Sequence, residues 1–471
     1  MKKYLSRLNF GYERVLLYML QQTEYDVGEY LRWLRRVKDF RAVVKRQSLV
    51  PTRKIKMLFL TLAIFVLLYI SAIFWMVIVV NTIWIYAIGF VLIMLLPVVA
   101  QYEIVLPLVI GKYLIQKPME GRILNRAREK FSNHPATKIA VVGSYGKTTA
   151  KEILASVLGA GKKIAATPGN INQPLGIAKF VDKLDGDEDI LIVEMGEFRV
   201  GDITKMCQLV NPDIGFITGV SEAHLATFGS MENIVATLFE LREFLGKKPL
   251  YLNGDNELLR SRVDKFSILY SHDGLGNHRV KDVEIEPLQT KFTFDGQPIT
   301  SKLIGRHNIG ITAAAMALAK KFGLSKHEIA SGIKALTPFE HRMAPTIMNG
   351  AVVIDDTYNG NLRGVLAGVE LVRELDGFGR KIYVTPGLVE QGDKTAAVHI
   401  EIGRALTNVF DSVVLMRNSV TEYILTGLEE NGFRGEITII DNPLDFYENL
   451  SSFLAMGDLV LMQNDWTDNY F

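Results

Sequence analysis

The sequence predicts an α/β protein in which a helical hairpin precedes a parallel-sheet domain and a second, doubly wound domain. Three observations predict this organisation. Residues 57–102, a run of 46, contain no Asp, Glu, Lys or Arg, although 22% of the chain is charged. From Lys138 onward, short β-rich runs alternate with helical patterns, which is typical of a parallel sheet flanked by helices. A glycine-rich turn at residues 143–149 separates the first such strand from a helix.

Composition narrows the class of protein. The chain has 471 residues, of which 48% are hydrophobic, so it is neither disordered nor collagen-like. Its single cysteine, Cys207, cannot form an internal disulfide or a Cys-based zinc site, which indicates a reducing compartment. Residues 1–56 carry a net charge of +9, and the rest of the chain carries −7. We expect four segments: 1–56, 57–116, 117–340 and 341–471.

The uncharged run is the right length for two membrane spans. A bilayer core of ~30 Å takes about 20 helical residues, so residues 57–102 predict a hairpin that turns near Asn81 and Thr82. Basic residues flank both ends and are absent from the turn, which predicts that both ends face the cytoplasm. We therefore expect a multi-pass protein of the plasma membrane with its catalytic domains in the cytoplasm. The alternative is a buried helical hairpin in a soluble protein.

Two weaker patterns flank the hairpin. Residues 27–44 combine apolar side chains at helical spacing with several arginines, which predicts a basic amphipathic helix. This helix either lies on an anionic inner leaflet or packs against the chain's own soluble domain. Residues 103–116 are apolar but too short for a third span, so an interfacial position is expected.

The glycine turn predicts a phosphate site. Residues 138–142 form a strand and residues 150–158 a helix, so the turn between them directs backbone N–H groups and the helix dipole at an anion. Lys147 would reach the β- and γ-phosphates, and the Thr148 hydroxyl would hold Mg²⁺. The first glycine comes only three residues before the second, which disfavours the common P-loop motors and GTPases. The nucleotide-binding residues expected in this turn are Gly143, Ser144, Gly146, Lys147, Thr148 and Thr149.

A family resemblance covers about residues 135–400. The turn, followed by Lys151 and Glu152, resembles the ATP loop of the Mur ligases, which are ATP-dependent amide-forming enzymes of cell-wall precursor synthesis. Six further segments resemble motifs of that family in the same order. They are residues 167–176, 192–203, 223–230, 305–309, 341–343 and 355–361.

The strand pattern and the resemblance together suggest further site residues. Glu194 ends an apolar strand, which places a carboxylate at the carboxyl edge of the sheet beside the phosphate turn. The resemblance implies ATP and Mg²⁺ as cofactors, catalytic roles for Lys147, Glu194 and His224, and metal ligation by Thr148, Glu194 and His224. It also implies nucleotide contacts from Arg306, His307, Asn308, Arg342, Asp356, Tyr358 and Asn359. As alternatives, Glu194 is an ordinary strand-end acid, His224 a loop histidine, and Arg306 and Arg342 surface ion-pair residues.

The chain departs from the family pattern in three places. The membrane hairpin stands where Mur ligases have a soluble domain that grips uridine diphosphate. Leu238 stands where most members carry a lysine that is carbamylated and helps hold a second Mg²⁺. Ile311 replaces an asparagine, and residues 463–471 do not match the family's C-terminal segment.

The predicted activity is an ATP-dependent carboxylate–amine ligase that works through an acyl phosphate on a peptidoglycan precursor. An alternative enzyme is a polyglutamate-type or lipid-linked-precursor amide ligase. An alternative without catalysis is a nucleotide-binding scaffold for wall synthesis. The expected partners are a small-molecule or lipid-linked peptide precursor, the membrane through two spans, and other wall-synthesis proteins; no nucleic-acid partner is expected.

Overall fold

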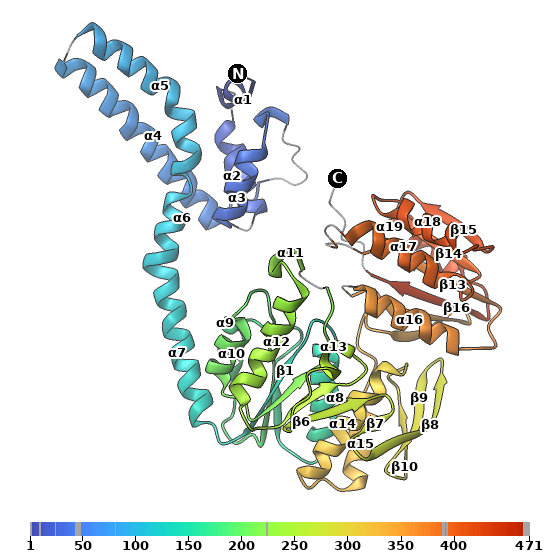
Figure 1. Cartoon of the computed structure of the whole chain (residues 1–471). Helices are drawn as coiled ribbons and strands as arrows, with labels where there is room; N and C mark the ends of the chain where they lie inside the picture. The colour runs from blue at the N-terminus through green and yellow to red at the C-terminus, as the bar shows by residue number, and fades with distance from the viewer. Residues whose placement is uncertain are drawn as a thin grey trace. The chain divides into compact units, whose positions relative to one another are not determined.

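The structure is a computed structural model of the whole chain (Figure 1). It describes residues 2–8, 11–23, 25–42, 49–80, 82–222, 225–358, 360–388, 391 and 394–464. The chain divides into two compact units, residues 1–123 and residues 124–471. Each unit has its own apolar cores.

The first unit contains two long apolar helices. Helix α4 spans Arg53–Val80 and helix α5 spans Ile83–Glu103, and the two run side by side (Figure 1). Both are long and apolar enough to cross a membrane, by length and composition alone. Only 6% of the most apolar stretch of α4 is buried, and Trp75 and Trp84 are exposed. This exposure argues against a hairpin that forms the core of a soluble protein, because core helices bury such side chains.

The N-terminal segment packs against the base of this hairpin. It contains α1 (Lys2–Leu5), α2 (Tyr12–Gln22) and α3 (Val27–Arg36). Buried Tyr30 and Leu34 share one core with residues of α2, α4 and α5, and the Tyr30 hydroxyl donates to the Gln101 carbonyl at 3.0 Å. The amphipathic helix expected over residues 27–44 is thus shorter than predicted. Within the first unit, it packs against α2 and the apolar hairpin.

The chain remains helical beyond α5. Helix α6 (Leu106–Gly111) leads through a π-helical turn (Lys112–Gln116) into α7 (Lys117–Asn133). The segment expected to form a separate interfacial piece, 103–116, is therefore part of a helical run of 51 residues from Ile83 to Asn133. Its charge pattern explains the change in character. After Glu103, charged residues resume at Lys112 and recur through α7, so the later turns are polar.

The second unit begins with a ten-stranded sheet in the order β10-β9-β8-β7-β6-β5-β4-β1-β3-β2. Strands β1 (Thr137–Val142), β2 (Ile164–Ala166), β3 (Ile190–Glu194), β4 (Ile214–Ile217), β5 (Leu250–Asn253) and β6 (Ser267–Ser271) are parallel. Strands β1 and β3 are almost entirely buried, as expected for strands covered on both faces. The parallel part agrees with the sequence prediction.

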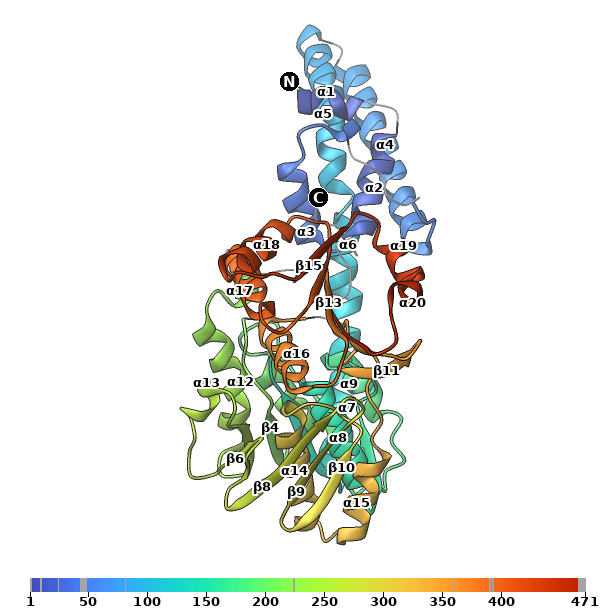
Figure 2. The same ribbon diagram turned by 90° about the vertical axis from the view of Figure 1, so that its right-hand side faces the viewer.

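An antiparallel extension, which the sequence pattern did not predict, completes the sheet (Figure 2). It consists of β7 (Gly274–Leu275), β8 (His278–Glu286), β9 (Gln289–Phe294) and β10 (Gln297–Ser301). Helices α8 (Lys147–Gly159), α14 (His307–Lys321) and α15 (Lys326–Ala335) share the main core with the sheet. The remaining helices are α9 (Pro174–Val181), α10 (Asp202–Val210), α11 (Leu225–Phe228), α12 (Met231–Leu245) and α13 (Glu257–Arg260).

The C-terminal part of this unit is a doubly wound sheet in the order β11-β12-β16-β13-β14-β15. All neighbours are parallel except β11 and β12. Helices α17 and α18 lie on one side and α19 and α20 on the other (Figure 2). The strands are β11 (Ala344–Met348), β12 (Ala351–Asp356), β13 (Arg380–Thr385), β14 (Ser412–Met416), β15 (Glu436–Ile440) and β16 (Asp458–Gln463). The helices are α16 (Leu362–Glu374), α17 (Thr395–Leu406), α18 (Thr421–Glu430), α19 (Pro443–Glu448) and α20 (Leu450–Phe453).

Candidate functional site

The candidate site is built around the turn between β1 and α8. Gly143 has φ +143°, and a Cβ at this position would lie 2.3 Å from the Thr218 Oγ1, so only glycine fits. Gly146 has φ +74° and forms the N-cap of α8. The first backbone bond of the helix runs from the Ala150 N–H to the Gly146 carbonyl. The N–H groups of residues 147–149 therefore have no carbonyl of the same helix to bind, and they can bind an anion.

Lys147 lies at the start of α8 and is held toward the turn. Its Nζ donates to the Gly143 carbonyl and lies 3.2 Å from the Glu197 Oε2. The Lys147 side chain is 16% exposed, whereas that of Glu197 is 3% exposed. Burial is the largest influence on Glu197 and raises the pKa of its carboxyl, while the Lys147 ammonium acts in the opposite direction. The phosphate-loop lysine thus has an acidic partner inside the site.

Glu194 ends β3 next to the turn, as the strand pattern predicts. In the sheet it pairs with Val141 of β1, and its backbone N–H donates to the Thr167 Oγ1 at 3.0 Å. The Asn172 Nδ2 donates to the Glu194 Oε1 at 3.1 Å. The Glu194 Oε2 is buried and has no hydrogen-bond partner in the described part of the chain. A buried carboxylate oxygen without a donor is well suited to a cation.

Lys151 lies one helical turn after Lys147 and is fully buried. Its Nζ donates to the carbonyls of Thr167, at 2.7 Å, and Gly169. The same ammonium lies 3.7 Å from the Glu194 Oε2. Lys151 therefore ties α8 to the segment after β2 and supplies positive charge beside the strand-end carboxylate.

Residues of the C-terminal part reach the same turn. The Arg342 Nη2 lies 3.4 Å from the Thr148 Oγ1, and the Arg342 guanidinium lies 4.2 Å from the centre of the Tyr358 ring. The Tyr358 hydroxyl accepts a hydrogen bond from the Asn170 Nδ2 at 2.9 Å. Arg342 and Tyr358 are thus brought to the phosphate turn, whereas a surface ion pair was the alternative for Arg342.

Asp356 ends β12 close to Arg342. Its Oδ1 accepts from the Met343 N–H at 3.2 Å, and its Oδ2 accepts from the Gln463 Nε2 at 2.8 Å. Burial, the largest influence, raises the pKa of Asp356 to about 7, although these two bonds and the Arg342 charge lower it. The group therefore titrates near neutral pH.

Three of the residues predicted to contact the nucleotide, Arg306, His307 and Asn308, lie at the start of α14. The Arg306 Nε donates to the Glu374 Oε1 of α16 at 2.7 Å. The Asn308 Nδ2 donates to the Ile304 carbonyl at 2.9 Å, so this side chain is bound to the segment just before α14. His307 begins α14 beside them. Among the described residues, no hydrogen bond or ion pair joins these three to the phosphate turn.

The structure describes only some of the residues predicted to form the metal site. His224 and Asn359 lie outside the described residues, so the structure places neither of them. Within the described ranges, no three His, Cys, Asp or Glu side chains gather as a metal site. Leu238 is fully buried in α12. Glu240, two residues after Leu238, accepts hydrogen bonds from the Gly201 and Thr204 N–H groups at 2.6 and 2.8 Å and so caps α10.

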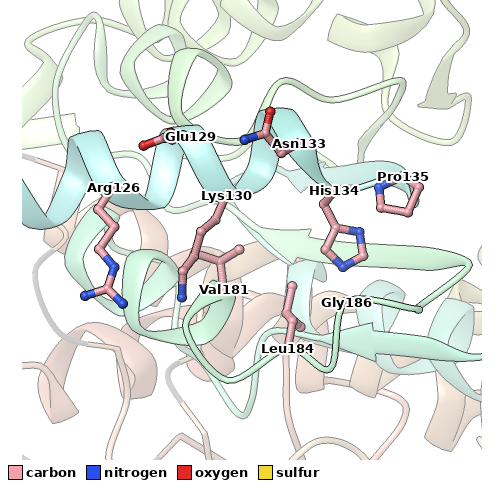
Figure 3. Close-up of a pocket in the computed structure, with 9 residues that line it drawn as sticks. All are labelled: Arg126, Glu129, Lys130, Asn133, His134, Pro135, Val181, Leu184 and Gly186. Atoms are coloured by element: carbon pink, nitrogen blue, oxygen red, sulfur yellow. The ribbon is translucent and has the colours of Figure 1, made fainter.

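A groove of about 450 Å³ lies elsewhere (Figure 3). It runs along the end of α7 and includes His134 and Pro135, which precede β1, and Gly186, which precedes β3. These positions mark the amino edge of the parallel strands, opposite to the edge that carries the phosphate turn. In open parallel sheets, ligands bind outside the carboxyl ends of the strands, so this groove is not the candidate site.

Sequence reasoning missed three side chains of the site. Glu197 and Asn172 lie in quoted motifs but received no role, and Lys151 was used only to support the resemblance. A signal existed for Lys151, because it follows Lys147 by four residues and so lies on the same helix face. No local signal marked Glu197, since its burial depends on the loop that follows β3.

Comparisons with known proteins agree with this geometry. The model of the Mur ligase middle domain matches residues 141–319. The UDP-N-acetylmuramoyl-tripeptide–D-alanyl-D-alanine ligase of Synechocystis is 31% identical over 335 residues, which cover 69% of this chain and 71% of the relative. That of Bacillus subtilis is 27% identical and covers 69% and 72%. The crystal structure of the MurF ligase of Thermotoga maritima in complex with ADP is 26% identical, covers 74% of this chain and 80% of its own, and has a TM-score of 0.63.

The matched relatives, the shared fold and the phosphate turn all support one assignment. The chain belongs to the Mur ligase family, whose members are ATP-dependent amide ligases.

Proposed function

We propose that this chain is a membrane-anchored, ATP-dependent ligase that joins a carboxylate to an amine on a peptide precursor of the cell wall. The observation that carries the proposal is the convergence of Lys147, Glu194 and Arg342 on the turn between β1 and α8. A lysine, a helix N-terminus and a strand-end carboxylate at one sheet edge suit phosphoryl transfer. The names of the relatives above support a peptide precursor as the substrate.

The reaction would proceed in two steps. An oxygen of the substrate carboxylate attacks the γ-phosphorus of ATP, the bond to ADP breaks, and an acyl phosphate forms. The nitrogen of the amine then attacks the acyl carbon, phosphate leaves, and the amine loses a proton as the amide forms. Lys147 and the N-terminal N–H groups of α8 neutralise the charge on the transferred phosphoryl group. Removal of one such contact commonly costs about 3 kcal/mol of barrier.

One residue at the phosphate turn and one at the end of β3 fit a magnesium ion. The Thr148 hydroxyl and the unpartnered Glu194 Oε2 are oxygen ligands of the kind that Mg²⁺ prefers. Bound there, Mg²⁺ would supply positive charge to the β- and γ-phosphate oxygens. Arg342, which contacts the Thr148 hydroxyl, would orient the C-terminal part over the nucleotide.

We further propose that α4 and α5 cross the plasma membrane with both ends in the cytoplasm. Their length, their exposed apolar side chains and the basic residues on both flanks support this topology. The ligase would then meet cytosolic ATP while fixed to the bilayer. The carboxylate substrate would be a nucleotide-linked or lipid-linked peptide, and other wall-synthesis proteins would be neighbours.

The test is product formation by the purified full-length chain in detergent. We expect ADP and phosphate release only when ATP, Mg²⁺, a muramoyl-peptide precursor and D-alanyl-D-alanine are all present, with a product heavier by one dipeptide less one water. Lys147→Ala and Glu194→Ala should each reduce turnover at least 100-fold, about 3 kcal/mol. Lys147→Ala should remain folded, since its side chain lines a ligand site. Glu194→Ala leaves the buried Lys151 ammonium without its carboxylate, so its folding is checked by urea unfolding and its turnover is compared with that of Glu194→Gln.

A matched control is Lys320→Ala, because that lysine is exposed on α14 and away from the turn. Its turnover should equal that of the wild-type chain. Phosphate release with a product of different mass would point to another amide ligase. ATP binding without release under every substrate combination would point to the scaffold alternative.

A further inference from the structure

The pairing of Lys147 with Glu197 needs an explanation. A lysine that binds a triphosphate must give up its other partner when the nucleotide binds. Here that partner is a carboxylate that is 3% exposed and lies 3.2 Å from the Lys147 Nζ. When a phosphate takes the lysine, the buried Glu197 charge loses its counter-ion. An unpaired buried charge is strongly unfavourable, so Glu197 then requires another cation.

A second carboxylate stands close to Glu197. Glu194 lies three residues earlier in the chain, and its charge contributes to the raised pKa of Glu197. The Glu194 Oε2 is buried and lacks a hydrogen-bond partner among the described residues. Nucleotide binding would bring the negatively charged phosphates close to these two carboxylates. The Lys151 ammonium, 3.7 Å from the Glu194 Oε2, compensates one negative charge. A divalent cation between the two carboxylates and the phosphates would neutralise the charge that Lys151 leaves uncompensated.

Two other acids near the site are held by other partners. Both oxygens of Glu240 are bound at the N-terminus of α10, and Leu238 has no ligand atom. Glu152 forms an ion pair with Lys151 at 3.1 Å. Glu197 differs from these two acids, because the side chain that holds it is the phosphate-loop lysine, Lys147, and its other hydrogen bond comes from its own backbone N–H.

We propose that Glu197 is a switching ligand of the magnesium site. It pairs with Lys147 while the phosphate loop is empty, and it turns to the metal beside Glu194 when a nucleotide phosphate takes the lysine. This inference rests on the proposed function and adds a residue that binds the metal directly. Glu197 would thus oppose the binding of metal-free nucleotide and favour the binding of its magnesium complex.

The test measures the affinity of the full-length chain for a non-hydrolysable ATP analogue, with Mg²⁺ and with EDTA, for the wild type and for Glu197→Gln. Without metal, the variant should bind the analogue several-fold more tightly, since Lys147 is released and one negative charge is gone. With Mg²⁺, it should bind more weakly. The ratio of the dissociation constant in EDTA to that in Mg²⁺ should be at least tenfold smaller for the variant than for the wild type. This corresponds to about 1.4 kcal/mol.

The control is Glu240→Gln, which changes a buried carboxylate that faces α10 instead of the loop. Its ratio should match that of the wild type. Glu197→Asp retains the charge on a shorter side chain and should give an intermediate ratio, which also covers the case that Glu197→Gln fails to fold. Direct binding of Mn²⁺ in the presence of the analogue, followed by electron paramagnetic resonance, gives a second readout.

The outcomes separate this inference from the proposed function. If Glu197→Gln tightens binding equally with and without metal, Glu197 is only a counter-ion of Lys147 and the inference is overturned. An unchanged ratio would also overturn it. If the wild-type chain itself shows no Mg²⁺-dependent binding of the analogue, the proposed function fails. If binding of the analogue depends on Mg²⁺ in the wild type but not in Glu194→Gln, the proposed function stands, whatever the result for Glu197→Gln.

Discussion

The Lys151 Nζ lies 3.7 Å from the Glu194 Oε2, and neither side chain is more than 2% exposed. The lysine also donates to the carbonyls of Thr167 and Gly169, so it has hydrogen-bond acceptors around its charge. This arrangement holds three segments together at the carboxyl edge of the sheet. Lys151 is therefore a positioning residue, distinct from Lys147, which faces the phosphate turn.

We expect Lys151→Met to destabilise the protein by about 3 to 5 kcal/mol, because it leaves the Glu194 carboxylate and two carbonyls without their cation. Unfolding by urea, followed by the fluorescence of the full-length chain in detergent, measures the change. Lys320→Met, an exposed lysine on another helix, should stay within about 0.5 kcal/mol of the wild type. Equal effects of the two substitutions would contradict the role of Lys151.

The stability of the second unit should depend on pH through Asp356. Its pKa rises from 3.8 to about 7 on folding because the carboxyl is buried. A group with a raised folded pKa contributes stability at pH values below its unfolded pKa and loses it as the pH rises through the folded pKa. The shift corresponds to roughly 4 kcal/mol as an order of magnitude.

The measurement compares the wild type with Asp356→Asn, which has nearly the same shape and no charge. The unfolding free energy of the wild type, relative to the variant, should fall between about pH 4 and pH 7 and stay level above pH 8. A difference between the two proteins that is constant from pH 4 to pH 8 would show that Asp356 does not titrate in this range.

Much of the fold follows from local patterns in the sequence. The uncharged run predicts α4 and α5, and the alternation after Lys138 predicts the parallel strands β1, β3 and β4. The antiparallel strands β7 to β10 were missed because β8 is largely exposed and has no clear apolar alternation. The helix expected over residues 27–44 was too long, because periodicity alone does not mark its end at Arg36.

The candidate site was predictable where a residue's place follows from its own strand or helix. Glu194 and Lys147 are such residues, since each lies at a strand end or helix start. The contact of Arg306 with Glu374 could not be predicted, because Glu374 lies on a helix 68 residues later and no local pattern shows that contact. The same holds for Glu197, whose burial depends on how one loop folds over the turn.

Leu238 leads to a prediction about carbon dioxide. If the enzyme is active, its metal site works without a carbamate at this position, because a buried leucine cannot bind a metal. Turnover should therefore be the same in carbonate-free buffer and with added bicarbonate, at constant pH and ionic strength. Sodium chloride at equal concentration is the control. Stimulation by bicarbonate alone would mean that a lysine elsewhere in the chain forms a carbamate.

The membrane topology can be tested by labelling of cysteines in intact cells. In a Cys207→Ala background, Asn81→Cys should react with an impermeant thiol reagent, because the predicted turn faces outward. Glu340→Cys should react only after the cells are opened, since that residue is 89% exposed and belongs to the part that we propose to be cytoplasmic. Labelling of Glu340→Cys in intact cells would reverse the orientation and remove the access of the ligase to cytosolic ATP.

The last prediction concerns the physical state of the substrate. Two apolar helices of about 20 residues or more fix a protein in the bilayer irreversibly, unlike a single lipid chain. A soluble nucleotide-linked peptide gains nothing from that anchor, whereas a lipid-linked peptide would share the membrane plane with the enzyme. The packing of α2 and α3 on the base of α4 adds folded structure to the anchor, which a simple tether would not need.

We therefore expect the full-length chain in lipid nanodiscs to turn over a lipid-linked peptide precursor faster than the nucleotide-linked peptide at equal bulk concentration. The comparison is repeated in detergent micelles, in which the two substrates lose their difference in local concentration. A preference that disappears in micelles would show that the hairpin acts by sharing the membrane plane, and one that persists would indicate direct recognition of the lipid-linked form. Equal or faster turnover of the soluble peptide in nanodiscs would contradict the prediction, because the hairpin would then serve only to place the ligase beside other proteins of wall synthesis.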